Sequence, residues 1–381
     1  MSMGATRRAH YDVAVVGAGP AGSACARRLA RAGCRVLLLE RSQFDKLRVG
    51  ESLAPAVQPL LADLGMWEDF LELDPLPSYG TRSVWGSADP QEHSHLATAY
   101  LNGWHVDRLR FDRMLASGAT QAGAQLRTGI RLVDCMRGSD ASYELRWKGG
   151  ADELATADFV IDATGRGSTL ARRCNARHAV FDRLVGVAMV FHDPNAAAHC
   201  YTLVETTPLG WWYSAPIGAT RSVAMLMSDG DIVRAHRLHQ SANWFSALVD
   251  VAATRERCRG AEPQCDPQIY SAISQRLIRN GVPREPWLAV GDAALSMDPI
   301  CGSGVIRALQ TAQAAETVVL EALQGNRELI GVYEADRDRD CTSYLFERRA
   351  YYEIEERWMS DVFWHRRISR WPVAVDRALQ Q

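Results

Sequence analysis

The chain has 381 residues, and its 43 Lys and Arg residues nearly balance its 45 Asp and Glu residues, giving a formal net charge of −2. This balance provides no positive field, so we expect no nucleic-acid partner. Hydrophobic residues at 47% and charged residues at 23% are typical of folded globular proteins and exclude disordered, collagen-like and coiled-coil chains. The length predicts two domains or one large one.

The sequence also limits location and metal binding. It contains no run of about 18 apolar residues, so we expect no membrane span. Residues 1–10 lack the pattern of a signal peptide, and we therefore expect a cytoplasmic protein. The nine cysteines are scattered without a Cys-x-x-Cys pair, which favours reduced, structural thiols and no metal site.

A strand–turn–helix–strand unit is predicted near the N-terminus. Residues 12–16 form a short apolar run that predicts a strand, and the glycine-rich segment 17–22 follows it. Residues 23–31 favour a helix, and residues 35–39 predict a second buried strand that ends at Glu40. An acidic residue about 20 positions beyond the first glycine completes the fingerprint of a dinucleotide-binding fold.

The spacing of this fingerprint assigns a role to each of its residues. Gly17 permits the tight turn, Gly19 lets the backbone approach a pyrophosphate, and Gly22 lets the helix pack closely on the strand. Glu40 is predicted to accept a hydrogen bond from the adenosine ribose. The predicted binding set also includes the neighbouring Pro20, Ala21 and Arg41.

Three further segments identify a family. Residues 159–165 predict a strand that runs into an Ala-Thr-Gly turn, and residues 288–294 predict another that ends in Gly-Asp-Ala-Ala. Residues 298–304 form an Asp-Pro-Ile-Cys-Gly-Ser-Gly turn before a predicted helix. In this order the motifs resemble the glutathione-reductase-type FAD-dependent superfamily, which contains aromatic hydroxylases, geranylgeranyl reductases and flavin-dependent halogenases. The resemblance implies that the dinucleotide is FAD.

The resemblance implies further FAD contacts. Gly165 closes the FAD domain, and Asp292 binds a hydroxyl of the ribityl chain. Pro299, Gly302, Ser303 and Gly304 precede a helix whose N-terminus faces the flavin pyrimidine edge. This placement stabilises the anionic reduced flavin.

Two more segments match the family. Residues 48–52 resemble the segment beside the isoalloxazine, with Arg48 and Ser52 as cofactor contacts and Ser52 as the N-cap of a helix. Glu51 is the candidate catalytic acid or base, although Arg48 and Glu51 can also be interpreted as solvated charges at a helix start. Residues 104–112 resemble a Val-x-Arg-x-x-Phe-Asp element whose arginine, here Arg108, touches the FAD.

A single dinucleotide fingerprint indicates that NAD(P)H binds transiently or that a separate reductase reduces the flavin. The predicted fold class is α/β: a discontinuous Rossmann-like FAD-binding domain accompanied by an α+β second domain with an antiparallel sheet. The predicted boundaries place residues 1–84, 105–182 and 276–340 in the FAD-binding domain, residues 85–104 and 183–275 in the substrate domain, and residues 341–381 in a helical C-terminal tail.

Residues 210–218 resemble the Trp-x-Trp-x-Ile-Pro signature of flavin-dependent halogenases, but imperfectly. Trp211, Trp212 and Tyr213 are candidate substrate contacts, and the alternative is that they are core or sheet residues. No lysine lies between Lys46 and Lys148, in the stretch where halogenases carry the lysine that captures hypohalous acid. Arg82 cannot form the same chloramine, and Cys301 stands where tryptophan halogenases have a glutamate. These departures disfavour halogenation.

Residues 351–358 and 363–367 resemble the tail of flavoprotein maturases that modify a tryptophan within a partner polypeptide. The alternative is an amphipathic helix that packs its aromatic residues on the FAD domain. Residues 86–100 are polar and predict a loop that could open for a protein substrate. His93, His95 and His105 are interpreted as surface or structural residues.

The sequence therefore predicts an FAD-dependent monooxygenase that uses O₂. Within the family, a flavin C4a-hydroperoxide delivers oxygen to an electron-rich aromatic substrate, either a metabolite or a tryptophan of a peptide or protein. One alternative is a flavin-dependent reductase that saturates isoprenoid double bonds, and a less favoured one is a halogenase. A third is a flavin-bound assembly partner without catalytic turnover.

Overall fold

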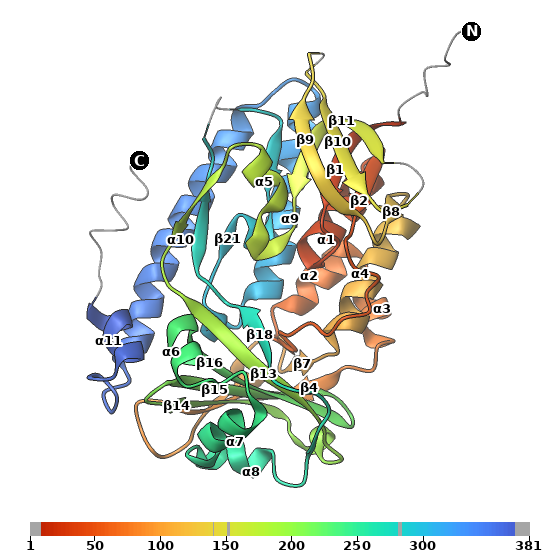
Figure 1. Ribbon diagram of the computed structural model, residues 1–381. Coiled ribbons are helices and arrows are strands. Elements are labelled where there is room, and N and C mark those ends of the chain that lie inside the picture. Colours follow the sequence, from red (N-terminus) through yellow and green to blue (C-terminus); the bar gives the residue numbers. More distant parts are fainter. Residues whose placement is uncertain (1–8, 140, 151–152, 281–283, 370–381) are drawn as a thin grey trace.

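The computed structural model describes residues 9–139, 141–150, 153–280 and 284–369. Two large sheets organise the chain, one near each end of the molecule, and a long C-terminal helix runs along its side (Figure 1). Among the described residues, no helix combines the length and the apolar character that crossing a bilayer requires.

The first sheet is the predicted nucleotide-binding sheet. Its strand order is β8-β2-β1-β11-β10-β9, and β20 pairs with β11. The pairs among β8, β2, β1, β11 and β20 are parallel, and those of β10 with β11 and β9 are antiparallel. The strands are β1 (Ala9–Val16), β2 (Val36–Leu39), β8 (Gln125–Arg127), β9 (Arg131–Arg137), β10 (Tyr143–Lys148), β11 (Leu154–Asp162) and β20 (Trp287–Ala289). This α/β arrangement confirms the predicted fold class.

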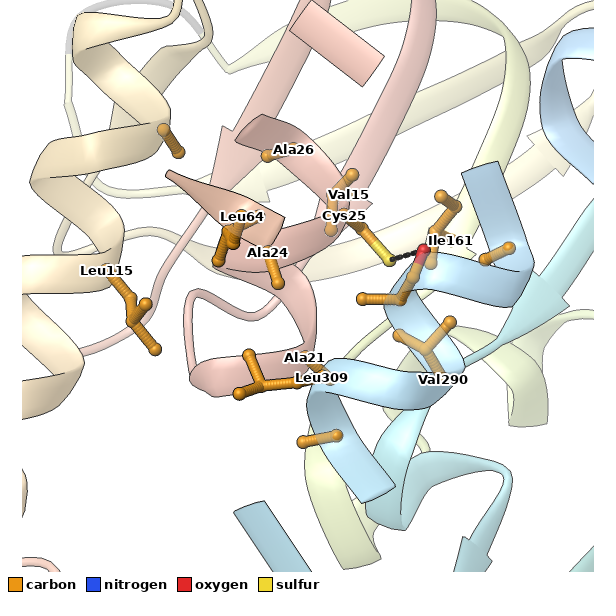
Figure 2. Close-up of a cluster of buried hydrophobic side chains, with 14 of the residues drawn as sticks. Val15, Ala21, Ala24, Cys25, Ala26, Leu64, Leu115, Ile161, Val290 and Leu309 are labelled. Atoms are coloured by element: carbon orange, nitrogen blue, oxygen red, sulfur yellow. Dashed lines mark hydrogen bonds between the residues drawn. The ribbon is translucent and has the colours of Figure 1, made fainter. Parts of the chain in front are cut away.

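Helices α1 (Pro20–Arg31), α4 (Arg108–Gln121) and α9 (Gly304–Leu323) pack together on one face of this sheet. Small residues of α1, among them Ala24, Cys25 and Ala26, allow the neighbouring elements to approach closely, and Figure 2 shows them among Leu115 and Leu309. The Cys25 thiol lies 3.9 Å from the carbonyl oxygen of Ala312 in α9. This core fixes the first turn of α1 against the ends of the parallel strands.

The second sheet has the strand order β17-β13-β16-β15-β14-β5-β6, with β18 also pairing with β13. All of its pairs are antiparallel except that of β14 with β5. The strands are β5 (Gly80–Val84), β6 (Gln91–Ser94), β13 (Leu184–His192), β14 (Tyr201–Thr207), β15 (Gly210–Gly218), β16 (Arg221–Asp229), β17 (Glu262–Pro263) and β18 (Gln268–Ser271). Helices α7 (Ser241–Val249) and α8 (Ala252–Arg257) lie on the side of this sheet that faces away from the first sheet, and α6 (Gly230–Ala235) follows β16 (Figure 1).

The pairing of β5 bears on the predicted division of the chain. The sequence assigned residues up to 84 to the FAD-binding domain, but β5 belongs to the second sheet because it pairs with β14 from Gly80 to Val84. The boundary at residue 84 therefore does not follow the sheet pairing. The other domain boundaries remain predictions.

Shorter elements connect the two sheets. One small sheet joins β3 (Ser52–Leu53), β7 (Gly103–His105) and β4 (Leu76–Ser78), and another joins β12 (Arg177–Val180), β19 (Gln275–Ile278) and β21 (Leu295–Ser296). The short helices are α2 (Val57–Leu64), α3 (Trp67–Leu71) and α5 (Thr169–Arg173). The prediction that Ser52 caps a helix is wrong, because Ser52 of β3 pairs with His105 of β7 and α2 begins only at Val57.

The C-terminal part consists of α10 (Glu328–Glu353) and α11 (Val362–Ser369), and residues 370–381 of the predicted tail lie outside the described residues. The predicted start of the tail at residue 341 falls within α10, which begins at Glu328. The tail aromatics gather around strands of the second sheet, with Trp85 and Trp364 ring centroids 5.2 Å apart. Trp364 packs with second-sheet residues and donates to the Thr207 carbonyl oxygen, whereas Tyr352 contacts this cluster and also the loop at Asp298.

Candidate active site

One cavity of about 960 Å³ reaches from the nucleotide fingerprint to the second sheet. Most of the predicted cofactor residues line it: Gly17, Gly19, Pro20, Ala21, Glu40, Arg41, Arg48, Ser52, Arg108, Gly165, Asp292, Pro299, Gly302, Ser303 and Gly304. Three predicted site residues, Gly22, Glu51 and Trp212, lie outside this lining. The structure thus brings distant segments of the chain to one site.

The glycine turn has the geometry that a bound pyrophosphate requires. A Cβ atom on Gly22 would lie 1.8 Å from the Gly17 carbonyl oxygen, so only glycine fits there. A Cβ on Gly19 would meet nothing within 4 Å, so this backbone is open towards the cavity that it lines. Helix α1 starts directly after Gly19 without a side-chain cap, and its first N–H groups are free to bind an anion.

Glu40 stands at the end of β2, as the fingerprint requires. Its Oε2 accepts a hydrogen bond of 2.8 Å from the Ala18 backbone N–H, and its Oε1 accepts one of 2.6 Å from the Ser42 hydroxyl. Oε1 also accepts from the Ser42 backbone N–H and from Arg48, so the carboxylate is oriented at the cavity and Oε2 keeps a lone pair for a ribose hydroxyl.

Two arginines are fixed beside the cavity by one buried carboxylate, Asp112. Arg48 Nη1 lies 2.6 Å from Asp112 Oδ2, and Arg108 Nε lies 3.1 Å from Asp112 Oδ1. Burial disfavours the charged form of Arg108, but Asp112 and Glu51 more than offset this effect and raise its pKa. The shared carboxylate therefore holds both guanidinium groups at the cavity. Asp112 ends the motif of residues 104–112, and no role was predicted for it, although its i+4 spacing from Arg108 predicts an ion pair.

The loop that precedes α9 exposes its backbone to the cavity. Gly302 has φ of +59°, and a Cβ on Gly302 or Gly304 would meet nothing within 4 Å. The 20-residue α9 has no side-chain cap at Ser303, so its first N–H groups are available to a ligand. Asp292 also lines the cavity and pairs with Arg166 at 2.8 Å, a partner that the motif did not reveal.

These residues fit FAD. The open backbone at Gly19 and the uncapped α1 suit its pyrophosphate, and Glu40 suits its ribose. Asp292 and the start of α9 line the same cavity, as the family motif requires of residues that contact the ribityl chain and the flavin ring.

The second sheet lines the other side of the cavity with uncharged side chains. They include Trp211 and Tyr213 of β15, Met225 and Met227 of β16, and Tyr270 and Ser271 of β18. The methionines and Tyr270 were not predicted, because no local sequence pattern distinguishes a cavity methionine from a core one.

Trp212 is not a substrate contact, which corrects the prediction. It alternates with Trp211 and Tyr213 along β15, so its side chain points to the opposite face of the sheet. There its ring packs edge-on against Trp244 of α7, with centroids 4.8 Å apart. The alternative interpretation, a core residue, is correct for Trp212.

Glu51 lies behind the cavity wall. Its side chain is 1% exposed, so the interpretation of Glu51 as a solvated charge is wrong. The Tyr213 hydroxyl donates to its Oε2 at 3.2 Å, and its Oε1 has no partner among the described residues. Burial raises the pKa of this carboxyl above its ordinary value, against the opposing effects of backbone N–H groups and Arg108.

Ser52 connects Tyr213 to a second buried group. Its hydroxyl lies 2.9 Å from the Tyr213 hydroxyl, 2.7 Å from Thr202 Oγ1 and 3.2 Å from His105 Nδ1. His105 is fully buried, and burial lowers its pKa to about 3, so it is neutral at neutral pH. Ser52 and Tyr213 line the cavity. His105 is therefore structural and supports this wall.

The comparison with protein families gives one match that covers most of the chain. Residues 10–345 match the FAD binding domain family. Over 361 residues the chain is 28% identical to LodB of Marinomonas mediterranea, whose name describes an FAD-dependent oxidoreductase, covering 94% of this chain and 96% of that protein. It is 27% identical to the 1H-pyrrole-2-carbonyl-[peptidyl-carrier protein] chlorinase of Pseudomonas fluorescens, covering 83% of this chain and 77% of the chlorinase.

Solved structures with the same fold include two halogenases. The myxobacterial chondrochloren halogenase CndH has a TM-score of 0.85 at 24% identity, covering 98% of this chain and 88% of that one. The flavin-dependent halogenase CmlS has a TM-score of 0.81 at 25% identity, covering 99% and 70%. The chain therefore belongs to the FAD binding domain family and is an FAD-dependent oxidoreductase related to the flavin-dependent halogenases, as its motifs predicted.

Proposed function

We propose that the protein is an FAD-dependent monooxygenase that hydroxylates an electron-rich aromatic ring. The observation that carries this proposal is the continuous cavity, which joins the FAD-binding residues to a wall of aromatic and thioether side chains without a lysine. The whole chain contains two lysines, Lys46 and Lys148, and both are exposed and outside the cavity lining. A halogenase of the lysine-dependent type would need such an amine next to its substrate.

Bound FAD, reduced by NAD(P)H or by a separate reductase, would supply the electrons that activate O₂. The overall change replaces a ring C–H by C–OH, consuming O₂, two electrons and two protons and releasing water. The second-sheet wall of the cavity offers the side chains of Trp211 and Met227 as surfaces against which an aromatic ring can pack.

Glu51 and Tyr213 are the proposed proton acceptors. A ring carbon that gains oxygen must lose its proton, and the Tyr213 hydroxyl is the polar group of β15 that lines the cavity. Because this hydroxyl donates to Glu51 Oε2, it can take a proton from the ring and pass its own to the carboxylate. The raised pKa of Glu51 makes it a stronger base than an exposed glutamate once it is ionised.

The proposed substrate is a neutral aromatic group, either a metabolite or a tryptophan within a peptide or protein. The second-sheet side chains at the cavity, including Trp211, Tyr213 and Met225, carry no charge to pair with a free carboxylate or ammonium. The chlorinase relative is named for a pyrrole group held on a carrier protein, which supports a tethered substrate here.

The test supplies the FAD-loaded enzyme with a flavin reductase, NADH, O₂ and chloride, and offers indole and tryptophan-containing peptides. We expect substrate-stimulated oxygen uptake and a product heavier by one or two oxygen atoms, as measured by mass spectrometry. A chlorinated product would refute hydroxylation and favour a halogenase. Anaerobic oxidation of the reduced enzyme by a polyprenyl substrate would instead identify an isoprenoid reductase.

The proton route has its own prediction. Glu51→Gln and Tyr213→Phe should each slow product formation by about 100-fold, as is typical for loss of a general base, and the double variant should be no slower. Tyr270→Phe is the matched control, because Tyr270 also lines the cavity but has no hydrogen bond to Glu51. Additive losses in the double variant would show that the two residues do not act in one route.

A further inference from the structure

Helix α10 presents a stripe of polar side chains to the cavity loop. Tyr344, Arg348 and Tyr352 are spaced four residues apart, so they share one face of the helix. Both tyrosine side chains are buried, at 3% and 0% exposure. The family motifs did not assign a role to any of the three.

Both tyrosine hydroxyls bind the same residue, Asp298, at the start of the loop that leads to α9. The Asp298 backbone N–H donates to the Tyr344 hydroxyl at 2.9 Å, and the Tyr352 hydroxyl donates to Asp298 Oδ2 at 2.8 Å. Asp298 lines the cavity and precedes the open glycine backbone at Gly302 by four residues. The helix therefore holds both the main chain and the side chain of this loop.

Tyr352 also reaches the second sheet. Trp211 Nε1 donates to the Tyr352 hydroxyl at 2.9 Å, and Trp211 lines the cavity on its substrate side. Burial raises the pKa of Tyr352 well above its ordinary value, so the hydroxyl keeps its proton and can donate to Asp298 while it accepts from Trp211. One phenol thus joins the cofactor side of the cavity to the substrate side.

Arg348 helps to hold Tyr344 in place. Its Nη1 lies 2.6 Å from Asp182 Oδ2 and 3.3 Å from the Tyr344 hydroxyl. The Ser274 hydroxyl lies 2.6 Å from the same tyrosine oxygen. Tyr344 is therefore positioned by several groups and cannot rotate away from Asp298 without breaking these bonds as well.

We propose that Tyr344 and Tyr352 are positioning residues that set the loop 298–304 against the flavin site and hold Trp211 in register with it. Helix α10 is then part of the active site, although in the described structure it contributes no side chain to the cavity wall. This inference rests on the proposed function only where it assigns Trp211 to the substrate side of the cavity. The role of the two tyrosines at the FAD site requires only that the protein binds FAD, as its family does.

The test compares Tyr352→Phe and Tyr344→Phe with Tyr351→Phe. Tyr351 is the matched control, because it neighbours Tyr352 and has no hydrogen bond from its hydroxyl to a described residue. Its ring lies tilted against Trp85, with centroids 4.7 Å apart. We expect about tenfold weaker FAD binding and an altered visible spectrum of the bound FAD in the first two variants, as the loss of a buried hydrogen bond to Asp298 implies. The control should match the unchanged protein in both measurements.

A stability loss without a change in FAD affinity or spectrum would overturn the proposal and leave the tyrosines a structural role. Hydrogen exchange of the unchanged protein keeps the proposal testable if the variants fail to fold. Because coupling is reciprocal, FAD should slow amide exchange in residues 344–353. If FAD did not change amide exchange in residues 344–353, the proposal would also be overturned. Neither readout depends on which reaction the enzyme catalyses.

Discussion

Two glycines of the same turn face opposite surroundings. A Cβ on Gly22 would collide with the Gly17 carbonyl oxygen and lie 2.8 Å from the Ala163 Cβ, both within the folded chain. A Cβ on Gly19 would enter only the cavity. The two positions therefore separate the packing of the fold from the binding of the cofactor.

Gly22→Ala should lower the free energy of unfolding of the FAD-free protein by about 1–3 kcal/mol, the usual cost of overpacking, and abolish FAD retention. Gly19→Ala should leave the stability of the FAD-free protein unchanged but weaken FAD binding at least about tenfold, because the added methyl group occupies the place of the pyrophosphate. Denaturant unfolding and FAD titration measure both. A destabilised Gly19→Ala protein would contradict this separation.

His105 makes stability depend on pH. Burial is the main reason that its pKa falls from 6.5 to about 3, with smaller contributions from Arg257 and His95. Below pH 6.5 the unfolded chain gains a proton that folded His105 does not, so this residue makes the folded state lose stability as the pH falls towards 3. Between these two pH values, the contribution of His105 lowers the free energy of unfolding by about 1.4 kcal/mol per pH unit.

The measurement is urea unfolding at pH 7 and pH 5. His105→Gln should reduce the stability difference between these conditions by about 2 kcal/mol. His93→Gln is the control, because His93 is exposed. The same pH dependence in His105→Gln as in the unchanged protein would show that His105 is protonated while folded.

At the scale of one element, strand β15 divides its aromatic residues between two environments. Trp211 faces the cavity and Tyr352 of α10. Trp212 faces the hydrophobic cluster that contains Trp244. The period of two in a strand is sufficient to predict that these neighbours diverge. Which of the two residues lines the cavity depends on which face of the sheet the helices α7 and α8 cover. That placement is set by tertiary packing, so the sequence could not show it.

Trp212→Ala should lower the free energy of unfolding by about 3–5 kcal/mol, since it removes a fully buried ring from the cluster. FAD affinity should stay unchanged in the folded fraction, because Trp212 does not line the cavity. Unfolding curves and FAD titration check the two halves of this prediction. Weakened FAD binding would contradict the prediction, because it would show that loss of the Trp212 ring changes the cofactor site on the other face of the sheet.

At the scale of the whole molecule, the nucleotide-binding half was predictable and the second half only in outline. The dinucleotide fingerprint works through local backbone geometry, so its spacing located Gly19 and Glu40. The resemblance to the FAD-dependent family was needed to assign Asp292 in the Gly-Asp motif. The helix cap at Ser52 failed because tertiary pairing with β7 overrides the local preference. The tail contacts through Tyr352 depend on long-range packing, which leaves no mark in the local sequence.

The cavity has an implication for biosynthesis. Its lining begins at Val16 and ends at Ala308, and the loop at Asp298 is held by Tyr352. A nascent chain therefore has no complete cofactor site until nearly all of its residues have left the ribosome. The glycine turn at residues 17–22 is synthesised long before α10, and the complete site needs both. We therefore expect FAD to bind after translation has ended and not to assist the folding of the nascent chain.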